Sequence, residues 1–133
     1  MKHSVLLIGL DKNNKVLLHH KSADAPHNAN QWCMLGGGVE EGESKEEAIK
    51  REMKEELNLD LEPEFFKSYR HSESWGDVER NVFSAKIDED IEELKKYQTE
   101  GDGMEFFSRE KMKDLIINEN HFFIIEEFFL EKF

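Results

Sequence analysis

Three glutamates, Glu52, Glu55 and Glu56, stand close together in a segment that repeats apolar residues at helical spacing. In a helix, Glu52 and Glu56 would be neighbours one turn apart, with Glu55 beside them. Two like charges at this spacing destabilise a helix by roughly a few tenths of a kcal/mol. Of the residues one turn away, only Arg51 is cationic. A hard divalent cation with oxygen ligands would supply the missing charge, although a solvated acidic helix face has the same composition.

The helix that carries these glutamates is predicted to span residues 45–57. Ser44, followed three positions later by Glu47, has the pattern of a capping box, which places the helix start at Lys45. Asn58 reaches the left-handed conformation that ends helices more readily than most residues do. The apolar stripe, which would face the core beside the glutamates, consists of Ile49, Met53 and Leu57.

The spacing around this helix resembles the signature of the Nudix hydrolase family, G-x5-E-x7-R-E-U-x-E-E-x-G-U, in which U is an aliphatic residue. Gly37 and Glu43 take the first two fixed positions, and residues 51–59, REMKEELNL, supply the rest. Asn58 is the one departure, because the family has glycine there. We expect this asparagine to end the helix normally, at a cost below about 1 kcal/mol relative to glycine.

The resemblance implies both a fold and an activity. The fold is α/β, an α/β/α sandwich with a mixed β-sheet between helices. The activity is hydrolysis of a nucleoside diphosphate linked to a further group, by attack of water on phosphorus with Mg²⁺ or Mn²⁺ bound. The resemblance also implies metal ligands, namely Glu52, Glu55 and Glu56, with the backbone carbonyl of Gly36 as a further one. In some members the glutamate at the position of Glu52 also accepts a proton.

Supporting roles and the general base follow from the same resemblance. Arg51 and Glu43 would pair with each other or with the carboxylates and so orient them. Gly37, within a run of three glycines, would let the backbone turn tightly and approach a ligand. The base is either one of the signature glutamates or a glutamate from a later loop. For the later loop, Glu100 is the first candidate and Glu105 the second.

Contacts to substrate are predicted around residues 72–77, a loop between two strands. Trp75 in this loop would either stack on a base or sugar, or fold back over the core. Arg70 and Arg80 flank the loop and are the best nearby cations for a phosphate, although each alone is more typical of solvated surface charge. These three residues are therefore the substrate-binding candidates.

The remaining elements are short. In the final helix, Phe122, Ile125 and Phe129 follow helical spacing, and Phe123 and Leu130 are expected to widen this stripe, which would pack on the core or form a dimer interface. The expected strands are residues 4–10, 16–20, 32–35, 64–71, 78–87 and 104–107, the expected later helices are residues 108–117 and 118–133, and residues 88–96 form a helical turn or a loop.

Composition bounds the function classes. A chain of 133 residues with 38% hydrophobic content is predicted to form one domain, residues 1–133. The net charge of −12 argues against a nucleic-acid polymer as partner, because no basic stripe exists to neutralise phosphates. The single cysteine, Cys33, favours a cytoplasmic location. No apolar run approaches the roughly 18 residues of a membrane span, so no membrane partner is expected.

The leading hypothesis is a MutT-like hydrolase of a (deoxy)nucleoside triphosphate, a small-molecule substrate, in a monomer or homodimer. An ADP-ribose or nucleotide-sugar pyrophosphatase is the nearest alternative, and no base-reading motif in the sequence separates the two. A non-catalytic nucleotide-binding module is a third possibility. The complete glutamate set argues against it, because a pure binder has no need of the mutually repelling Glu52 and Glu56.

Overall fold

Seven strands and four helices make up residues 1–133, all of which the computed structural model describes. The strands are β1 Lys2–Leu10, β2 Val16–His20, β3 Trp32–Cys33, β4 Leu35–Gly38, β5 Glu64–Glu73, β6 Gly76–Lys86 and β7 Gly103–Phe107. The helices are α1 Lys45–Leu57, α2 Ile91–Lys95, α3 Arg109–Met112 and α4 Glu119–Lys132. None of these helices has both the length and the apolar character needed to span a bilayer.

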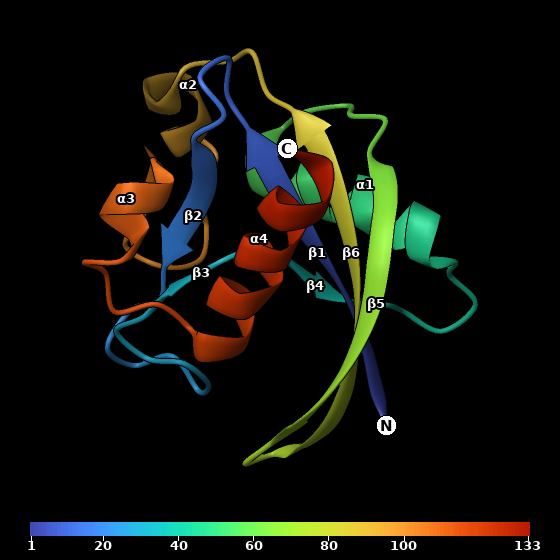
Figure 1. The fold of residues 1–133 in the computed structure, drawn as a ribbon. Helices are drawn as coiled ribbons and strands as arrows, with labels where there is room; N and C mark the ends of the chain where they lie inside the picture. Colours follow the sequence, from blue (N-terminus) through green and yellow to red (C-terminus); the bar gives the residue numbers. More distant parts are fainter.

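The sheet is built around β1, its central strand. β1 runs parallel to β6 along its whole length and antiparallel to β2 and β4. The order is β3-β2-β1-β6-β5, with β4 paired to β1 and β7 paired to β2. Helices α1 and α4 lie on opposite faces of this mixed sheet (Figure 1), so the expected α/β/α sandwich is confirmed.

Alternation along the strands divides the core in two. In β1, Val5 and Leu7 pack with α1, whereas Leu6 and Ile8 pack with α4. This follows from the period of two in a strand, which sends successive side chains to opposite faces. The buried residues of α1 are Ala48, Ile49, Met53 and Leu57. The predicted apolar stripe of α1 therefore faces the sheet and fixes which edge of the helix its glutamates occupy.

Both predicted ends of α1 are confirmed. Ser44 accepts the backbone N–H of Glu47, and the Glu47 carboxylate accepts the backbone N–H of Ser44, which completes the capping box. Asn58 has φ 57° and ψ 36°, the left-handed conformation, and its own N–H bonds the carbonyl of Lys54. Asparagine therefore replaces the glycine of the family signature without changing how the helix ends.

Two predicted connections are wrong because strands continue through them. Residues 36–38, expected as a turn, belong to β4 and pair with residues 4–6 of β1. Glycines without side chains let this strand lie close against its neighbours, and backbone pairing then holds it extended. Residues 72–77, expected as a loop, mostly belong to β5 and β6, and only Ser74 and Trp75 form the turn.

Two expectations for the C-terminal region are also wrong. The helix that begins after Ser108 ends at Met112 instead of near Ile117, because the backbone on either side of Ile117 bonds to Trp32 and extends the sheet. In α4, Phe123 and Leu130 are 55% and 81% exposed instead of widening the core stripe. At about 100° per residue they lie opposite the buried face. That face consists of His121, Ile124, Ile125, Phe128 and Phe129.

Candidate functional site

The edge of α1 that carries Glu52 and Glu56 lies against the glycine strand β4. A Cβ atom at Gly37 would stand 2.3 Å from the nearer carboxylate oxygen of Glu52, so a larger residue there would displace this glutamate. At Gly36, φ is 154° and a Cβ would lie 1.9 Å from the carbonyl oxygen of Val5. The backbone at Gly36 therefore requires glycine, whereas the signature glycine Gly37 leaves room for the carboxylate of a signature glutamate.

The carboxylates of Glu52 and Glu100 lie near enough to Glu56 to raise its pKa. Partial burial and then the carboxylate of Glu52, followed by the charge of Glu100, raise the pKa of Glu56 to about 9, while a backbone hydrogen bond from Gly36 acts in the opposite direction. Without a cation, such a pair keeps a proton between its oxygens. A divalent cation would replace that proton, so the pair has the chemistry of a Mg²⁺ or Mn²⁺ site.

Arg51 holds this edge together from the side. Its guanidinium donates to both carboxylate oxygens of Glu43, at 2.7 and 3.0 Å, and to Glu52 at 2.9 Å. It also donates to the carbonyl oxygen of Gly38 at 2.9 Å and reaches Glu55 at 3.3 Å. The bond to Arg51 lowers the pKa of Glu43, so both partners stay charged. The expected pairing of Arg51 with Glu43 is present, and it ties α1 to β4 and to the loop between them.

Glu55 stands apart from the other two candidate ligands. Its side chain is 58% exposed and bonds to Arg51. The structure brings together no three His, Cys, Asp or Glu side chains in a geometry that would enclose a metal ion. Mg²⁺ is commonly held by one or two carboxylates, with waters and substrate phosphates completing its shell. The residues present therefore fit a cation on Glu52 and Glu56, with Glu55 at the periphery.

Hydrogen bonds that the sequence pattern did not indicate hold the loop that carries Glu100 against β2 and β7. Gln98 donates to the carbonyl oxygens of Glu100 and Gly103 at 2.9 and 2.8 Å. The backbone N–H of Asp102 bonds the carbonyl of His20 at 3.0 Å, and the side chains of these two residues meet at 2.5 Å. These contacts link distant segments, so no local spacing reveals them. They hold Glu100 near Glu56.

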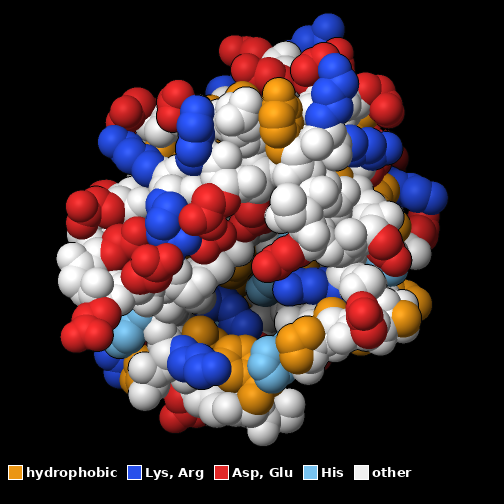
Figure 2. Space-filling view, turned by 180° about the vertical axis from the view of Figure 1, so that it is seen from behind, with side chains coloured by type: hydrophobic (Ala, Val, Ile, Leu, Met, Phe, Trp, Pro, Cys, Tyr) orange, Lys and Arg blue, Asp and Glu red, His pale blue; other side chains and the backbone are white.

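A cleft of about 1100 Å³ adjoins the acidic edge. It lies between the start of β1, the β5–β6 hairpin, the start of α4 and residues 21–31. Figure 2 shows this hollow, with basic, histidine and hydrophobic side chains around it and acidic side chains gathered to one side. Glu52, Glu55, Glu56 and Glu100 do not line the cleft, whereas residues 36–38 do. The glycine strand therefore borders both the glutamates and the cleft.

These features agree with comparisons to known proteins. The model of the NUDIX domain family matches residues 2–128. The chain belongs to the Nudix family. The resemblance read from the signature is thus confirmed over nearly the whole chain, far beyond the signature itself.

Curated relatives of this Nudix chain match over shorter stretches. A nucleoside triphosphatase NudI from Enterobacter sp. (strain 638) is 42% identical over 53 residues, 40% of this chain and 38% of that protein. An 8-oxo-dGTP diphosphatase from Escherichia coli (strain K12) is 36% identical over 61 residues, 44% of this chain and 46% of that protein. These matches span less than half the length of either relative.

Solved structures match the whole fold. A MutT protein from Methanosarcina mazei Go1 superposes with a TM-score of 0.85 at 23% identity, covering 98% of this chain and 94% of that one. The NUDIX domain of Shewanella oneidensis NrtR, solved with ADP ribose, has a TM-score of 0.74 at 16% identity and covers 93% and 83% of the two chains. At these identities the likeness establishes the fold alone.

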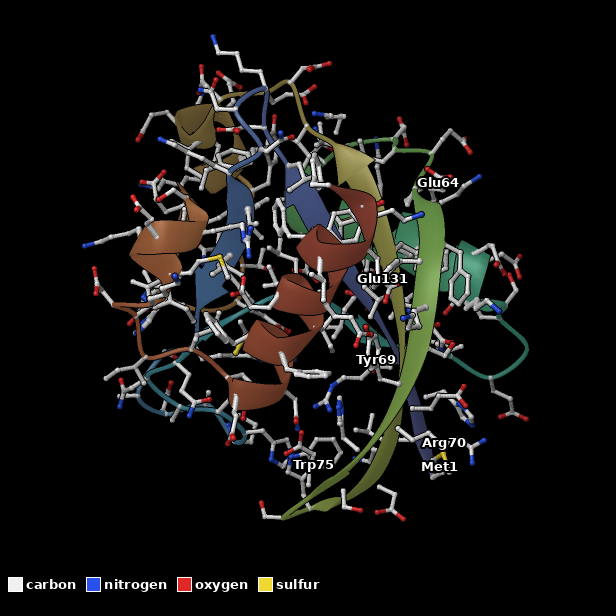
Figure 3. The ribbon with its side chains drawn as sticks, in the orientation of Figure 1. Met1, Glu64, Tyr69, Arg70, Trp75 and Glu131 are labelled. Carbon is white, nitrogen blue, oxygen red and sulfur yellow. The ribbon has the colours of Figure 1, made fainter.

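The three substrate-binding candidates of this Nudix chain do not share one location. Figure 3 shows Arg70 and Trp75 on opposite sides of the β5–β6 hairpin, and only Trp75 and Arg80 line the cleft. The side chain of Arg70 is 72% exposed and rests on Glu79 at 3.5 Å. Successive side chains along a strand point to opposite faces of the sheet, so a shift of one position places a side chain on the other face.

Trp75 and Arg80 each have partners inside the protein. Trp75 packs against His27 with ring centres 4.8 Å apart and ring planes tilted by 32°, so the hairpin turn contacts residues 21–31 at the cleft. Arg80 is 4% exposed and donates to Glu73 at 2.8 Å and to His71 at 2.9 Å. The cleft wall is thus cationic where Arg80 stands, although its guanidinium is already held by these two neighbours.

Proposed function

We propose that this Nudix enzyme hydrolyses the pyrophosphate linkage of a nucleoside diphosphate linked to a further group, with a (deoxy)nucleoside triphosphate as its substrate. The supporting observation is the position of β4, which has the Glu52–Glu56 pair on one side and the cleft on the other. A nucleotide lying across residues 36–38 would have its base in the cleft and its phosphates at the glutamates. The names of the curated relatives, a nucleoside triphosphatase and an 8-oxo-dGTP diphosphatase, agree with a triphosphate substrate.

Charge explains why a cation belongs to the proposal. The chain carries a net charge of −12, and a polyphosphate would add further negative charge at carboxylates that already repel one another. Glu52 and Glu56 would hold Mg²⁺ or Mn²⁺, with the carbonyl of Gly36 and the more exposed Glu55 as further ligands. Bound there, the cation supplies charge neutralisation, polarisation of the phosphoryl oxygen and a more acidic bound water.

The other residues orient groups or move protons. Arg51, with Glu43, holds Glu52 in place through direct bonds and would act on the substrate only through these carboxylates. Glu100 is the proposed proton acceptor for the attacking water, because its loop is fastened beside Glu56. Glu52 is the alternative acceptor. Arg80 and Trp75 would contact the nucleoside part, and Arg70 is left outside this role by its position.

We further propose that residues 1–133 act as one Nudix domain, as a monomer or homodimer, in the cytoplasm. The two core clusters share the single sheet, which supports one domain. The one cysteine, Cys33, is buried and free, which suits a reducing compartment. A small-molecule nucleotide is the proposed partner, since the surface charge is unsuited to a nucleic-acid polymer.

A substrate panel tests the proposed activity. Nucleoside triphosphates, deoxynucleoside triphosphates, ADP-ribose and nucleotide sugars are incubated with Mg²⁺, with Mn²⁺ and with excess chelator, and the phosphorus-containing products are separated. We expect a triphosphate to yield a monophosphate and pyrophosphate, and chelator to abolish the reaction. Preferred cleavage of ADP-ribose would move the assignment to the alternative class. The absence of metal-dependent cleavage for every compound would overturn the proposal.

A further inference from the structure

The imidazole of His121 presents a hydrogen-bond donor to the cleft. His121 stands in the first turn of α4, is 5% exposed and lines the cleft. Its Nδ1 accepts the backbone N–H of Met34 at 3.0 Å. A backbone N–H only donates, so Nδ1 carries the lone pair and the ring proton is on Nε2. No protein atom accepts a hydrogen bond from this N–H. Gln31 carries the one fully buried side-chain atom that lacks a partner, so Nε2 of His121 is not fully buried and is accessible from the cleft.

A second donor is fixed by the same kind of argument. The backbone N–H of His121 donates to Oδ1 of Asn118 at 3.0 Å, so the other end of the Asn118 amide must be its NH₂ group. That NH₂ donates to Oδ1 of Asn28 at 3.1 Å. Asn28 lines the cleft, and its own NH₂ group is left without a protein partner. Two backbone amides thus set the direction of both side chains, and each leaves a donor available to a ligand.

The charged groups nearby strengthen this polarity. Burial, and then the charges of Arg80 and Lys21, hold the pKa of His121 well below its usual value, with His19 and His71 acting in the same direction. His121 is therefore neutral at physiological pH and keeps its Nε2–H. Lys21 also lines the cleft and has donors only. The groups that most lower the pKa of His121 are basic side chains, and His121, Asn28 and Lys21 each present a donor to this end of the cleft.

We propose that this donor end of the cleft, formed by His121, Asn28 and Lys21, selects nucleobases by the group at purine position 6 or pyrimidine position 4. Bases with a carbonyl there are preferred to bases with an amino group there. This inference rests on the proposed function and deepens it by naming a substrate class. Guanine offers two adjacent acceptors, O6 and N7, and thymine or uracil offers O4. Adenine and cytosine place an NH₂ donor at the corresponding position, where it would meet the donor of His121.

The size of the preference follows from leaving a buried donor unpaired. A carbonyl base would satisfy Nε2–H, whereas an amino base would remove water from it and place a donor where the carbonyl acceptor would stand. Enzyme sites built to hydrogen-bond one substrate group discriminate strongly against analogues that cannot form the bond. We expect GTP to be preferred to ATP, and UTP to CTP, by about ten- to hundredfold in kcat/KM.

Two substitutions of His121 separate its contact to the base from its contact to Met34. In His121→Asn, the amide oxygen falls where Nδ1 was, so the bond from the Met34 N–H is kept and the cleft donor is lost. In His121→Gln, the amide NH₂ reaches the position of Nε2, so the donor is kept and the Met34 bond is lost. A purely structural role predicts the larger loss of function in His121→Gln, and a specificity role predicts it in His121→Asn.

The test measures kcat/KM for GTP, ATP, UTP and CTP with Mg²⁺, together with the unfolding temperature of each variant. We expect His121→Asn to bring the carbonyl-to-amino ratio to within about threefold of unity with the unfolding temperature little changed. We expect His121→Gln to retain the ratio while unfolding at a lower temperature. Equal rates for carbonyl and amino bases in the wild type, or an unchanged ratio in His121→Asn, would overturn the inference.

Binding of the nucleoside monophosphates by calorimetry, without metal, separates this inference from the proposed function. GMP bound about tenfold more tightly than AMP, with the difference lost in His121→Asn, supports base selection even if no nucleotide is hydrolysed. Equal affinity, or no binding of either monophosphate, counts against it. Failure of all hydrolysis with intact selective binding would overturn the catalytic proposal alone.

Discussion

The acidic edge of α1 and the donor end of the cleft lie on either side of the same glycine strand and have opposite chemistry. The acidic edge crowds Glu52 and Glu56 together with Glu100 nearby, and has an excess of acceptors. The donor end combines His121 and Asn28 with Lys21, and has an excess of donors. One region is complete only with a cation and the other only with an acceptor. A nucleotide with a carbonyl base and metal-bound phosphates satisfies both.

The two regions also differ in how they are built. Along α1 the glutamates are a few residues apart, and the helix itself sets their spacing. The donor end draws on α4, residues 21–31 and the peptide of Met34, which meet only in the folded chain. We therefore expect substitutions in the acidic edge to act on turnover, and substitutions at the donor end to act on selectivity and on stability.

The largest effect is expected at Glu56. Replacing Glu56 by Gln removes one carboxylate of the pair while keeping its volume, so kcat should fall by more than about a hundredfold with the fold intact. Steady-state kinetics with Mg²⁺ and far-ultraviolet circular dichroism measure the two properties. Glu110→Gln, a substitution of an exposed glutamate on α3 that does not line the cleft, is the matched control and should be nearly silent. Comparable activity in Glu56→Gln and Glu110→Gln would contradict the metal assignment.

The next effect concerns the acid stability that depends on two buried histidines of the cleft, His19 and His121. Burial lowers the pKa of His19 from 6.5 to about 4, and His121 is shifted in the same direction. Below pH 6.5 the histidines bind protons in the unfolded chain but not in the folded chain. Their contribution to the free energy of unfolding is therefore complete above pH 6.5 and falls as the pH is lowered. His19 alone should cost about 2 kcal/mol between pH 7 and pH 5.

Denaturant unfolding at pH 7 and pH 5 measures this loss. Glu56 titrates with the opposite sign, because its raised pKa favours the folded state at low pH. The experiment is therefore made in the Glu56→Gln background, which removes that contribution. A free energy of unfolding that is equal at the two pH values in this background would show that the histidines are not buried and neutral as described.

A smaller effect is expected at Arg51. Lysine keeps the charge but cannot bond Glu43, Glu52 and the carbonyl of Gly38 at once, as the guanidinium does. We expect Arg51→Lys to lower kcat by about tenfold and to leave the GTP-to-ATP ratio unchanged, because Arg51 orients carboxylates and does not reach the donor end. A changed ratio would show that the two regions are coupled.

The smallest effect is expected at Asn58. Glycine adopts the left-handed conformation without steric cost, so Asn58→Gly should change the free energy of unfolding by less than about 1 kcal/mol. Asn58→Ala is the control, and it should destabilise the protein more, because alanine carries the full penalty of a positive φ. Equal stability of the glycine and alanine variants, measured by denaturant unfolding, would contradict this account.

Much of the acidic edge could be predicted from the sequence because its interactions are local. The capping box at Ser44, the left-handed Asn58 and the buried stripe of α1 depend on residues three or four positions apart, whose geometry the helix fixes. The pairing of Arg51 with Glu43 was also predicted, because the family spacing brings the loop before α1 back onto the helix. The mixed sheet between helices followed from the same resemblance.

The tertiary structure alone decided the rest, because backbone pairing and register between distant segments choose the outcome. Pairing with β1 makes residues 36–38 a strand, and pairing with Trp32 stops α3 early. Packing on the sheet, not the count of aromatic residues, decides which face of α4 is buried. The backbone N–H of Met34, far away in the sequence, orients the ring of His121. The backbone N–H of His121 orients Asn28 through the side chain of Asn118. Short-range spacing therefore fixed the groups available for catalysis, and long-range contacts fixed the shape and polarity of the cleft beside them.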